Sequence, residues 1–483
     1  MATALPHNAA SFTLGEVVAA TGGTLVYGNT STALHGVSTD TRGLVPGALF
    51  VALVGAHHDA HHHLAAATSA RAGAVIVQRG RGRGLGTLPV VEVDDTLVAL
   101  GALAHAHAAR IRAQRPIPVV AISGAVGKTT TKELLAAAFG AAFGPTLATR
   151  GNLNNLVGAP LTLLGLTAEH RAAVIECGSN APGEIARIAE MVAPEVALCT
   201  NADAAHTALL GSVQAVAEEE GAVFAYARRA VVGNVDEPLS RAQMLRAAPG
   251  VAWWLFGEAA EANLQVRARK LRPDGLSDVL LSLDTTRCRG RATMTIRTPL
   301  LGPAAGINLC AAVTALLAAG ADPSTLSVVG EALGKVAPVP GRLSPREVDG
   351  VLWIDDTYNA SPRAVRAALV TARELADLRG GRLVVALGDM LELGALSAES
   401  HAAVGREVAG ARAAVFVAAG PEMARAAAEA RAAGVETVVA VADADGAREA
   451  LVGRVAPTDV VLVKGSRGLA MERCLPPGGA PLA

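Results

Sequence analysis

The sequence predicts an α/β protein of three domains: a small α/β domain at the N-terminus, a central doubly wound sheet, and a Rossmann-like α/β domain at the C-terminus. Its 483 residues suit about three domains of ~150 residues each. From residue 116 onwards, short apolar runs alternate with alanine-rich stretches, which is typical of parallel sheets covered by helices. A proline- and glycine-rich segment at 336–342 divides this series. We therefore place the domains at 1–112, 113–337 and 338–483.

The composition argues against several classes of protein. The formal net charge of -1 gives no electrostatic reason for binding nucleic acid or a membrane surface. The five cysteines are scattered and form no Cys-x-x-Cys pair, so we expect reduced thiols in the core. The chain shows neither a secretory signal pattern nor a charge-free apolar run of ~18–20 residues. We expect a soluble, cytoplasmic protein.

The first domain is predicted to begin with a helix at 11–20, capped by Ser11 or Thr13, and to contain strands at 47–53 and 72–77. The Gly/Arg stretch at 79–86 indicates a surface loop. Histidines at 57, 58, 61, 62 and 63 surround Asp59 and raise the question of a metal site. They lack the separated spacing of a structural zinc site, so we favour a polar loop that binds a ligand or caps a helix.

Strands of the central domain are expected at 119–122, 173–176, 196–200 and 230–233. Three of them end in polar residues: Ser123, Glu176 and Thr200-Asn201. Because ligands of open α/β sheets bind beyond the carboxyl ends of the strands, we expect these side chains to converge. The residues 255–256 and the stretch 264–299 favour a β-rich hairpin insertion, and 308–320 favours a helix.

Five apolar runs predict the C-terminal sheet, at 351–354, 383–387, 414–418, 437–441 and 460–463, and the tail 476–483 is expected to be disordered. Arg342 lies between the two larger domains. It is either a surface residue or a group that reaches phosphate when the domains close.

The central domain is organised around 118–132, an apolar strand followed by a glycine turn and a helix that starts at Lys128. Free N–H groups and the helix dipole make such a turn an anion site. Lys128 would reach the β- and γ-phosphates of ATP, and the Thr129 hydroxyl would hold Mg²⁺. Ile122 replaces one glycine of the long P-loop pattern, which leaves a shorter form. The predicted ATP-binding residues are Ser123, Gly124, Ala125, Val126, Gly127, Lys128, Thr129 and Thr130.

Ordered motifs along the whole chain resemble those of the Mur ligases. The N-terminal domain has Ser-Thr-Asp-Thr-Arg at 38–42 and Asp-Ala-His at 59–61. The central domain adds Arg-Gly-Asn-Leu-Asn-Asn at 150–155, Glu-Cys-Gly-Ser-Asn at 176–180 and Ala-His at 205–206. The C-terminal domain has Asp-Asp-Thr-Tyr-Asn-Ala at 355–360, Gly-Asp-Met-Leu-Glu-Leu-Gly at 388–394 and Lys-Gly-Ser-Arg at 464–467. The first two of these C-terminal strings resemble the branch that adds D-alanyl-D-alanine.

The resemblance implies that the carboxylate of UDP-N-acetylmuramoyl-tripeptide attacks ATP. D-alanyl-D-alanine then attacks the acyl phosphate and gives the UDP-N-acetylmuramoyl-pentapeptide precursor of peptidoglycan, on an enzyme that we expect to be a monomer. It assigns catalysis and Mg²⁺ binding to Lys128, Thr129, Glu176 and His206. It assigns nucleotide contacts to Asn308, Arg342, Asp356, Tyr358 and Asn359. It assigns substrate contacts to Ser38, Arg42, His61, Asn152, Asn154, Asn155, Lys464 and Arg467. Turn formation alone also explains the asparagines at 152–155 and the residues at 356–359.

Two positions depart from the family pattern. Relatives carry a carbamylated lysine after the histidine, and here Glu220 takes that position by register, within Glu218–Glu220. We expect its carboxylate to supply the catalytic and metal-binding charge directly, although such a run is also typical of a solvated helix face. Ala305 replaces a family asparagine near adenine, and Asn308 remains.

Other readings stay open at this point. The nearest alternatives are a ligase that adds a diamino acid and a folate polyglutamate ligase, and the C-terminal strings and the full N-terminal domain argue against both. A P-loop regulator would bind nucleotide without forming a bond, and the two departures would also suit an inactive homologue. The identity of the amine that the protein accepts as a substrate, if it accepts one, distinguishes among these hypotheses.

Overall fold

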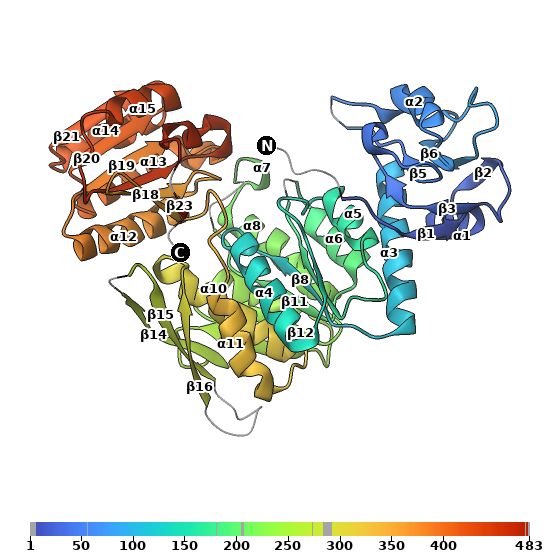
Figure 1. The fold of residues 1–483 in the computed structure, drawn as a ribbon, viewed down its shortest axis with the longest axis horizontal. Coiled ribbons are helices and arrows are strands. Elements are labelled where there is room, and N and C mark those ends of the chain that lie inside the picture. Colours follow the sequence, from blue (N-terminus) through green and yellow to red (C-terminus); the bar gives the residue numbers. More distant parts are fainter. Residues whose placement is uncertain are drawn as a thin grey trace.

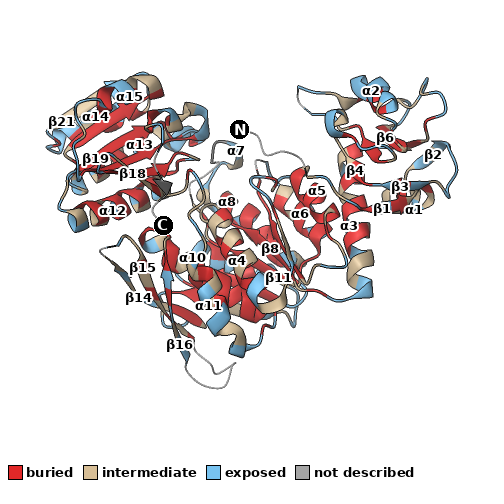
Figure 2. Ribbon diagram, in the orientation of Figure 1, coloured by how far each residue is buried: buried red, intermediate tan, exposed pale blue. Residues whose placement is uncertain are grey.

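The computed structural model describes residues 6–55, 57–179, 181–203, 207–272, 274–283, 292–478 and 480–481. The chain forms three α/β domains, and the N-terminal and C-terminal domains lie on opposite sides of the central one (Figure 1). Burial is greatest in the strands and in the helix faces that cover them (Figure 2). The predicted α/β class with parallel sheets is confirmed.

The N-terminal domain is built on a sheet of order β2-β7-β6-β5-β4, in which β2 runs antiparallel to β7 and the other neighbours are parallel. Its strands are β2 (Thr24–Tyr27), β4 (Val37–Ser38), β5 (Leu49–Val51), β6 (Ala74–Gln78) and β7 (Val90–Val93), beside the separate pair β1 (Ser11–Thr13) and β3 (Ala33–His35). The helices are α1 (Leu14–Thr21) and α2 (Leu64–Ser69). Of the two candidate caps of α1, Thr13 is the one used, in a capping box with Glu16.

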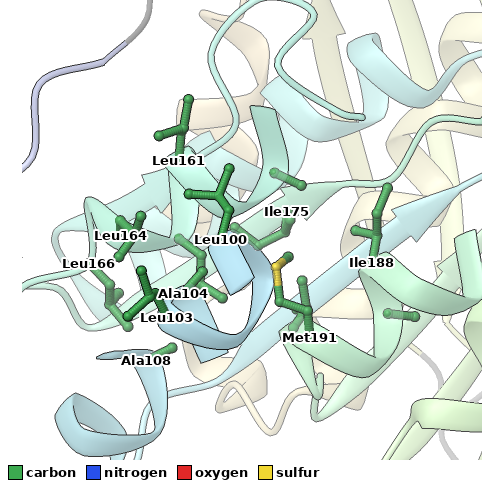
Figure 3. Close-up of a cluster of buried hydrophobic side chains, with 14 of the residues drawn as sticks. Leu100, Leu103, Ala104, Ala108, Leu161, Leu164, Leu166, Ile175, Ile188 and Met191 are labelled. Carbon is green, nitrogen blue, oxygen red and sulfur yellow. The ribbon is translucent and has the colours of Figure 1, made fainter. Parts of the chain in front are cut away.

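Helix α3 (Thr96–Gln114) connects the first domain to the second. Its buried residues Leu100, Leu103 and Ala108 pack in one apolar cluster with Leu164 and Met191 of the central domain (Figure 3). The His107 ring lies 2.7 Å from the carbonyl oxygen of Leu166 and forms a hydrogen bond with it. Helix α3 is therefore part of the central core as much as a linker.

Within the described chain, the central sheet has the order β16-β15-β14-β13-β12-β11-β8-β10-β9 and is parallel from β14 to β9. Its strands are β8 (Val119–Ser123), β9 (Thr146–Ala148), β10 (Ala172–Glu176), β11 (Val196–Cys199), β12 (Ala230–Asn234), β13 (Ala252–Gly257), β14 (Leu264–Leu271), β15 (Ser277–Leu283) and β16 (Ala292–Thr298). The expected hairpin region is correct in its β content. It extends the main sheet by antiparallel strands β15 and β16 instead of standing apart from it.

Helices cover both faces of the central sheet. They are α4 (Lys128–Phe143), α5 (Gly158–Leu164), α6 (Glu184–Val192), α7 (Thr207–Leu210), α8 (Val213–Gly221), α9 (Pro238–Gln243), α10 (Gly302–Ala318) and α11 (Leu326–Gly334). One face packs on α4, α10 and α11, and the other on α3, α5 and α6. Helix α10 begins six residues before the expected start at Asn308, because Pro303 stands in its first turn, where a missing N–H costs nothing.

The C-terminal sheet has the order β21-β20-β19-β22-β18-β17-β23. Its strands are β17 (Ser344–Val348), β18 (Val351–Asp356), β19 (Leu383–Gly388), β20 (Val415–Ala419), β21 (Thr437–Val441), β22 (Val460–Lys464) and β23 (Ala480–Pro481). Its helices are α12 (Pro362–Arg379), α13 (Ser397–Gly410), α14 (Met423–Ala432) and α15 (Ala444–Leu451). The expectation of a fully disordered tail is wrong at β23, which pairs with β17, a strand that the apolar pattern did not indicate.

Candidate active site

The phosphate loop lies between β8 and α4, at the carboxyl edge of the central sheet. Gly124 and Gly127 adopt φ values of 128° and 89°, which favour glycine. A Cβ at Gly124 would lie 2.0 Å from the Thr200 hydroxyl, so the loop is packed against the end of β11. Asn201 completes this packing, because its side chain accepts a hydrogen bond from the Val126 N–H at 2.9 Å. The expected convergence of strand ends on the loop is confirmed here.

The end of β10 brings a carboxylate to the start of α4. The Thr129 hydroxyl donates to Glu176 Oε1 at 3.2 Å, and Asn154 Nδ2 donates to the same oxygen at 2.8 Å. The N–H of Glu176 donates to the Thr149 hydroxyl at 2.9 Å, a contact that no motif indicated. Glu176 is 1% exposed, and among the described residues its Oε2 has no hydrogen-bond partner. A hydroxyl beside a buried, half-satisfied carboxylate is a donor set that fits Mg²⁺.

Helix α8 places the acidic run against the loop instead of in solvent. Glu220 is buried, and its Oε2 accepts a hydrogen bond from the Gly124 N–H at 2.6 Å. Its Oε1 lies 3.6 Å from the Lys128 ammonium, which also donates to the Gly124 carbonyl. Glu218 alone of the three is exposed, so the solvated-face interpretation holds only for that residue.

A cavity of about 370 Å³ separates the phosphate loop from the C-terminal domain. Predicted residues that line it are Ala125, Val126, Gly127, Lys128, Thr129, Thr130, Asn152, Asn154, Asn155, Glu176, Asn308, Arg342, Asp356, Tyr358, Asn359 and Lys464. Sequence reasoning missed Ser179, Leu300, Leu301, Ser361 and others in the same lining. Ser179 belongs to the motif at 176–180, which could have indicated it, whereas the two leucines carry no sequence signal.

On the far side of the cavity, Lys464 and Asp356 form a buried ion pair with a distance of 2.7 Å between Nζ and Oδ2. The ammonium also donates to the Asn359 carbonyl at 2.7 Å. Burial raises the pKa of the Asp356 carboxyl above its usual value, and the Lys464 charge opposes that shift. The Arg342 guanidinium lies 4.2 Å from the centre of the Tyr358 ring, a cation–π contact that holds both side chains at the cavity.

The predicted contacts to the UDP-sugar lie in the N-terminal domain. Ser38 hydrogen-bonds the backbone of Asp40, whose carboxylate pairs with the exposed Arg42 at 2.6 Å. His61 is buried, and both ring nitrogens are occupied: Nδ1 lies 2.7 Å from Asp59 Oδ1, and Nε2 accepts from the Gln78 N–H at 3.0 Å. His61 therefore holds the loop, while Arg42 presents an accessible charge. No metal-binding group of three acidic, histidine or cysteine side chains occurs in the described ranges.

Several predicted residues do not line the cavity in the described part of the chain. His206 lies outside the described residues. Arg467 pairs with Glu472 at 3.2 Å, is half exposed and does not line the cavity. Ser123 and Gly124 stand just behind the cavity wall, where the Ser123 hydroxyl donates to the Glu220 carbonyl at 2.7 Å.

Comparison with known proteins places these features in context. The sequence matches the Mur ligase middle domain over residues 122–316 and the Mur ligase glutamate ligase domain over residues 341–467. It is 35% identical over 474 residues to the UDP-N-acetylmuramoyl-tripeptide–D-alanyl-D-alanine ligase of Escherichia coli (strain K12), covering 91% of this chain and 92% of that protein. A crystal structure of MurF from Acinetobacter baumannii is similar with a TM-score of 0.84 and 28% identity, covering 97% of this chain and 98% of that one. MurF ligase from Thermotoga maritima in complex with ADP shares the fold, with a TM-score of 0.77 at 24% identity and coverage of 91% and 95%.

Proposed function

The chain belongs to the Mur ligase family, and we propose that it joins D-alanyl-D-alanine to UDP-N-acetylmuramoyl-tripeptide at the expense of ATP. The observation that carries this proposal is one cavity with a phosphate loop and the Thr129–Glu176 pair on one wall, and the Lys464–Asp356 pair on the other. The product is the UDP-N-acetylmuramoyl-pentapeptide precursor of peptidoglycan.

The chemistry needs positioning and charge neutralisation more than covalent help from the protein. A carboxylate is a poor electrophile, so its oxygen must first attack the γ-phosphorus of ATP to form an acyl phosphate and ADP. The amine of the dipeptide then attacks the acyl carbon, and phosphate leaves with the carbon–oxygen bond electrons. The N–H groups in the first turn of α4 and the Lys128 ammonium bind the phosphates, while Lys464 faces the same space from the other domain.

We assign Mg²⁺ to Thr129 and Glu176, with His206 and Glu220 completing the set. The bound ion would neutralise phosphate charge during transfer. The unpaired oxygen of Glu176 supports the first two residues. Glu220 supplies its charge without carbamylation, and its place beside Lys128 and Gly124 puts that charge at the phosphate loop.

The remaining assignments follow the domain layout. Residues 1–112 bind the UDP-sugar through Ser38, Arg42 and the loop fixed by His61, residues 113–337 bind ATP, and residues 338–483 complete the ligase site. Asn308, Arg342, Asp356, Tyr358 and Asn359 contact the nucleotide, and Asn152, Asn154, Asn155, Lys464 and Arg467 contact the peptide substrates. We propose a cytoplasmic monomer. In the described part of the chain, no helix combines the length and apolarity needed to cross a bilayer.

The test is phosphate release from ATP in the presence of UDP-N-acetylmuramoyl-tripeptide, with and without D-alanyl-D-alanine. Release that requires the dipeptide, with a pentapeptide product by mass spectrometry, is the expected result. Lys128→Met should lower turnover at least about 100-fold, whereas Lys270→Met, at an exposed lysine of the same domain, should leave it unchanged. Release with a free diamino acid and a shorter precursor, or nucleotide binding without release, would contradict the proposal.

A further inference from the structure

Helix α6 lacks a side-chain cap of its own. It begins at Glu184 and is preceded by Gly183 at φ 83°, which has no side chain to accept a hydrogen bond from the first-turn N–H groups. Such groups need a partner from elsewhere when they are not exposed to water. The backbone that leads into α6 is also the segment that leaves Glu176 at the end of β10, so its position matters for the cavity.

Glu219 of α8 supplies the missing cap from 36 positions further along the chain. Its Oε2 accepts from the Gly183 N–H at 2.7 Å, and its Oε1 accepts from the Ile185 N–H at 2.9 Å. The side chain is 8% exposed, so both bonds form away from bulk water. A carboxylate at a helix N-terminus also interacts favourably with the helix dipole.

The next residue of α8 binds the other wall of the site. Glu220 accepts from the Gly124 N–H, so one turn of α8 holds the phosphate loop with one carboxylate and the loop after β10 with the other. Gly178 and Ser179, which line the cavity, lie between Glu176 and the capped residues. Helices α6 and α8 lie in the same part of the central domain (Figure 1).

We infer that Glu219 is a positioning residue for the Mg²⁺–nucleotide site: it fixes the backbone at Gly183 and Ile185, at the start of α6, and thereby the orientation of Glu176 relative to Thr129. The inference rests on the proposed function, because it concerns the same site. It assigns a role that the acidic composition of the run does not show. It also separates Glu219 from exposed Glu218, whose carboxylate accepts a hydrogen bond from Gln214 of its own helix at 3.0 Å.

The test uses the full-length protein with three variants. Glu219→Gln keeps the side-chain volume but leaves one oxygen for two N–H groups, Glu219→Ala removes the cap, and Glu218→Gln is the matched control. The rate of hydrogen–deuterium exchange in the peptide 177–190 measures how well Glu219 protects the N–H groups at the start of α6. Binding of the fluorescent nucleotide mant-ADP, titrated with Mg²⁺, measures the affinity of the site for Mg²⁺ and nucleotide without requiring catalysis.

We expect both Glu219 variants to accelerate exchange in this peptide and to raise the Mg²⁺ concentration for half-maximal mant-ADP binding about tenfold. Glu218→Gln should change neither. Faster exchange with an unchanged Mg²⁺ curve would make Glu219 a helix cap only and would overturn the inference, as would no change in either measurement. If Glu219→Ala fails to fold, the same two measurements on the isosteric variant Glu219→Gln test the inference. Loss of pentapeptide synthesis in the wild type, with normal mant-ADP binding, would instead contradict the proposed function.

Discussion

Breaking the Lys464–Asp356 ion pair should destabilise the C-terminal domain, and by an amount that depends on pH. At 2.7 Å and an effective dielectric constant of about 20, the attraction between the two charges is about 6 kcal/mol. Desolvation of two buried ions offsets much of that gain, but removing one partner leaves the other charge buried alone, which costs about 3–5 kcal/mol. Lys464→Met and Asp356→Asn should each therefore lower the free energy of unfolding by about 3 kcal/mol or more at pH 8.

The pH dependence follows from the carboxyl group. Burial already raises the pKa of Asp356, and removal of the ammonium in Lys464→Met raises it further. A carboxyl whose folded pKa exceeds its unfolded value supports the fold below that unfolded value, and this support is lost as the pH rises through the folded pKa. The penalty of Lys464→Met, relative to wild type at the same pH, should therefore be smaller at pH 5 than at pH 8.

The assay is urea unfolding followed by the fluorescence of Trp353, which lies in β18 on the same strand as Asp356. The chain has three tryptophans, so Trp253→Phe and Trp254→Phe in all variants leave a signal from the C-terminal domain alone. The double variant Lys464→Met/Asp356→Asn should cost at least about 2 kcal/mol less than the sum of the single variants. Additive losses, or a Lys464→Met penalty that does not change with pH, would refute the reasoning.

Three further predictions concern other contacts. Asn154→Ala removes the amide that donates to Glu176, so about tenfold more Mg²⁺ should be needed for half-maximal activity; an unchanged titration would contradict this. Burial lowers the pKa of His107, so its neutral ring supports the fold above pH 6.5 and this support is lost as the pH falls. Unfolding of His107→Gln at pH 5 to 8 should therefore show a weaker pH dependence than wild type. Gly302→Ala places a Cβ 2.1 Å from the Thr371 hydroxyl at φ 75° and should cost about 1–3 kcal/mol in denaturant unfolding, part of which Thr371→Ala restores.

The sequence was sufficient for most of the fold because the parallel strands are buried on both faces and appear as short apolar runs. The predicted runs at 119–122 and 383–387 lie within β8 and β19, with boundaries that differ by one residue. The search for apolar runs did not indicate β17, because Ser344 and Arg346 interrupt its apolar character. The strand forms through its pairing with β18. The tail was misjudged for a related reason, since pairing partners supply the order that local composition lacks.

The candidate site was predictable where chemistry is local and unpredictable where it depends on distant packing. The glycine turn with Lys128 and Thr129 forms its site from consecutive residues. Glu219 contacts a turn 36 residues away, and its neighbours in the acidic run gave no sign of which carboxylate faces inward. The bonds that occupy both nitrogens of His61 likewise come from Asp59 and the distant backbone of Gln78, so a motif match alone overstates its freedom to bind a ligand.

The charges around the cavity explain why Mg²⁺ should be required for nucleotide binding as well as for chemistry. Among the described residues, the cations Lys128, Arg342 and Lys464 line the cavity together with the carboxylates of Glu176 and Asp356, and Glu220 lies just behind its wall. A polyanion such as ATP therefore gains no net attraction from formal charge, because Lys128 and Lys464 each already have a carboxylate partner. A divalent cation between Glu176 and the phosphates changes that balance, since it removes repulsion on one wall and frees the ammonium groups for the phosphates. Nucleotide affinity should consequently fall steeply when Mg²⁺ is chelated, and chelation-insensitive binding of ATP would contradict this account of the site.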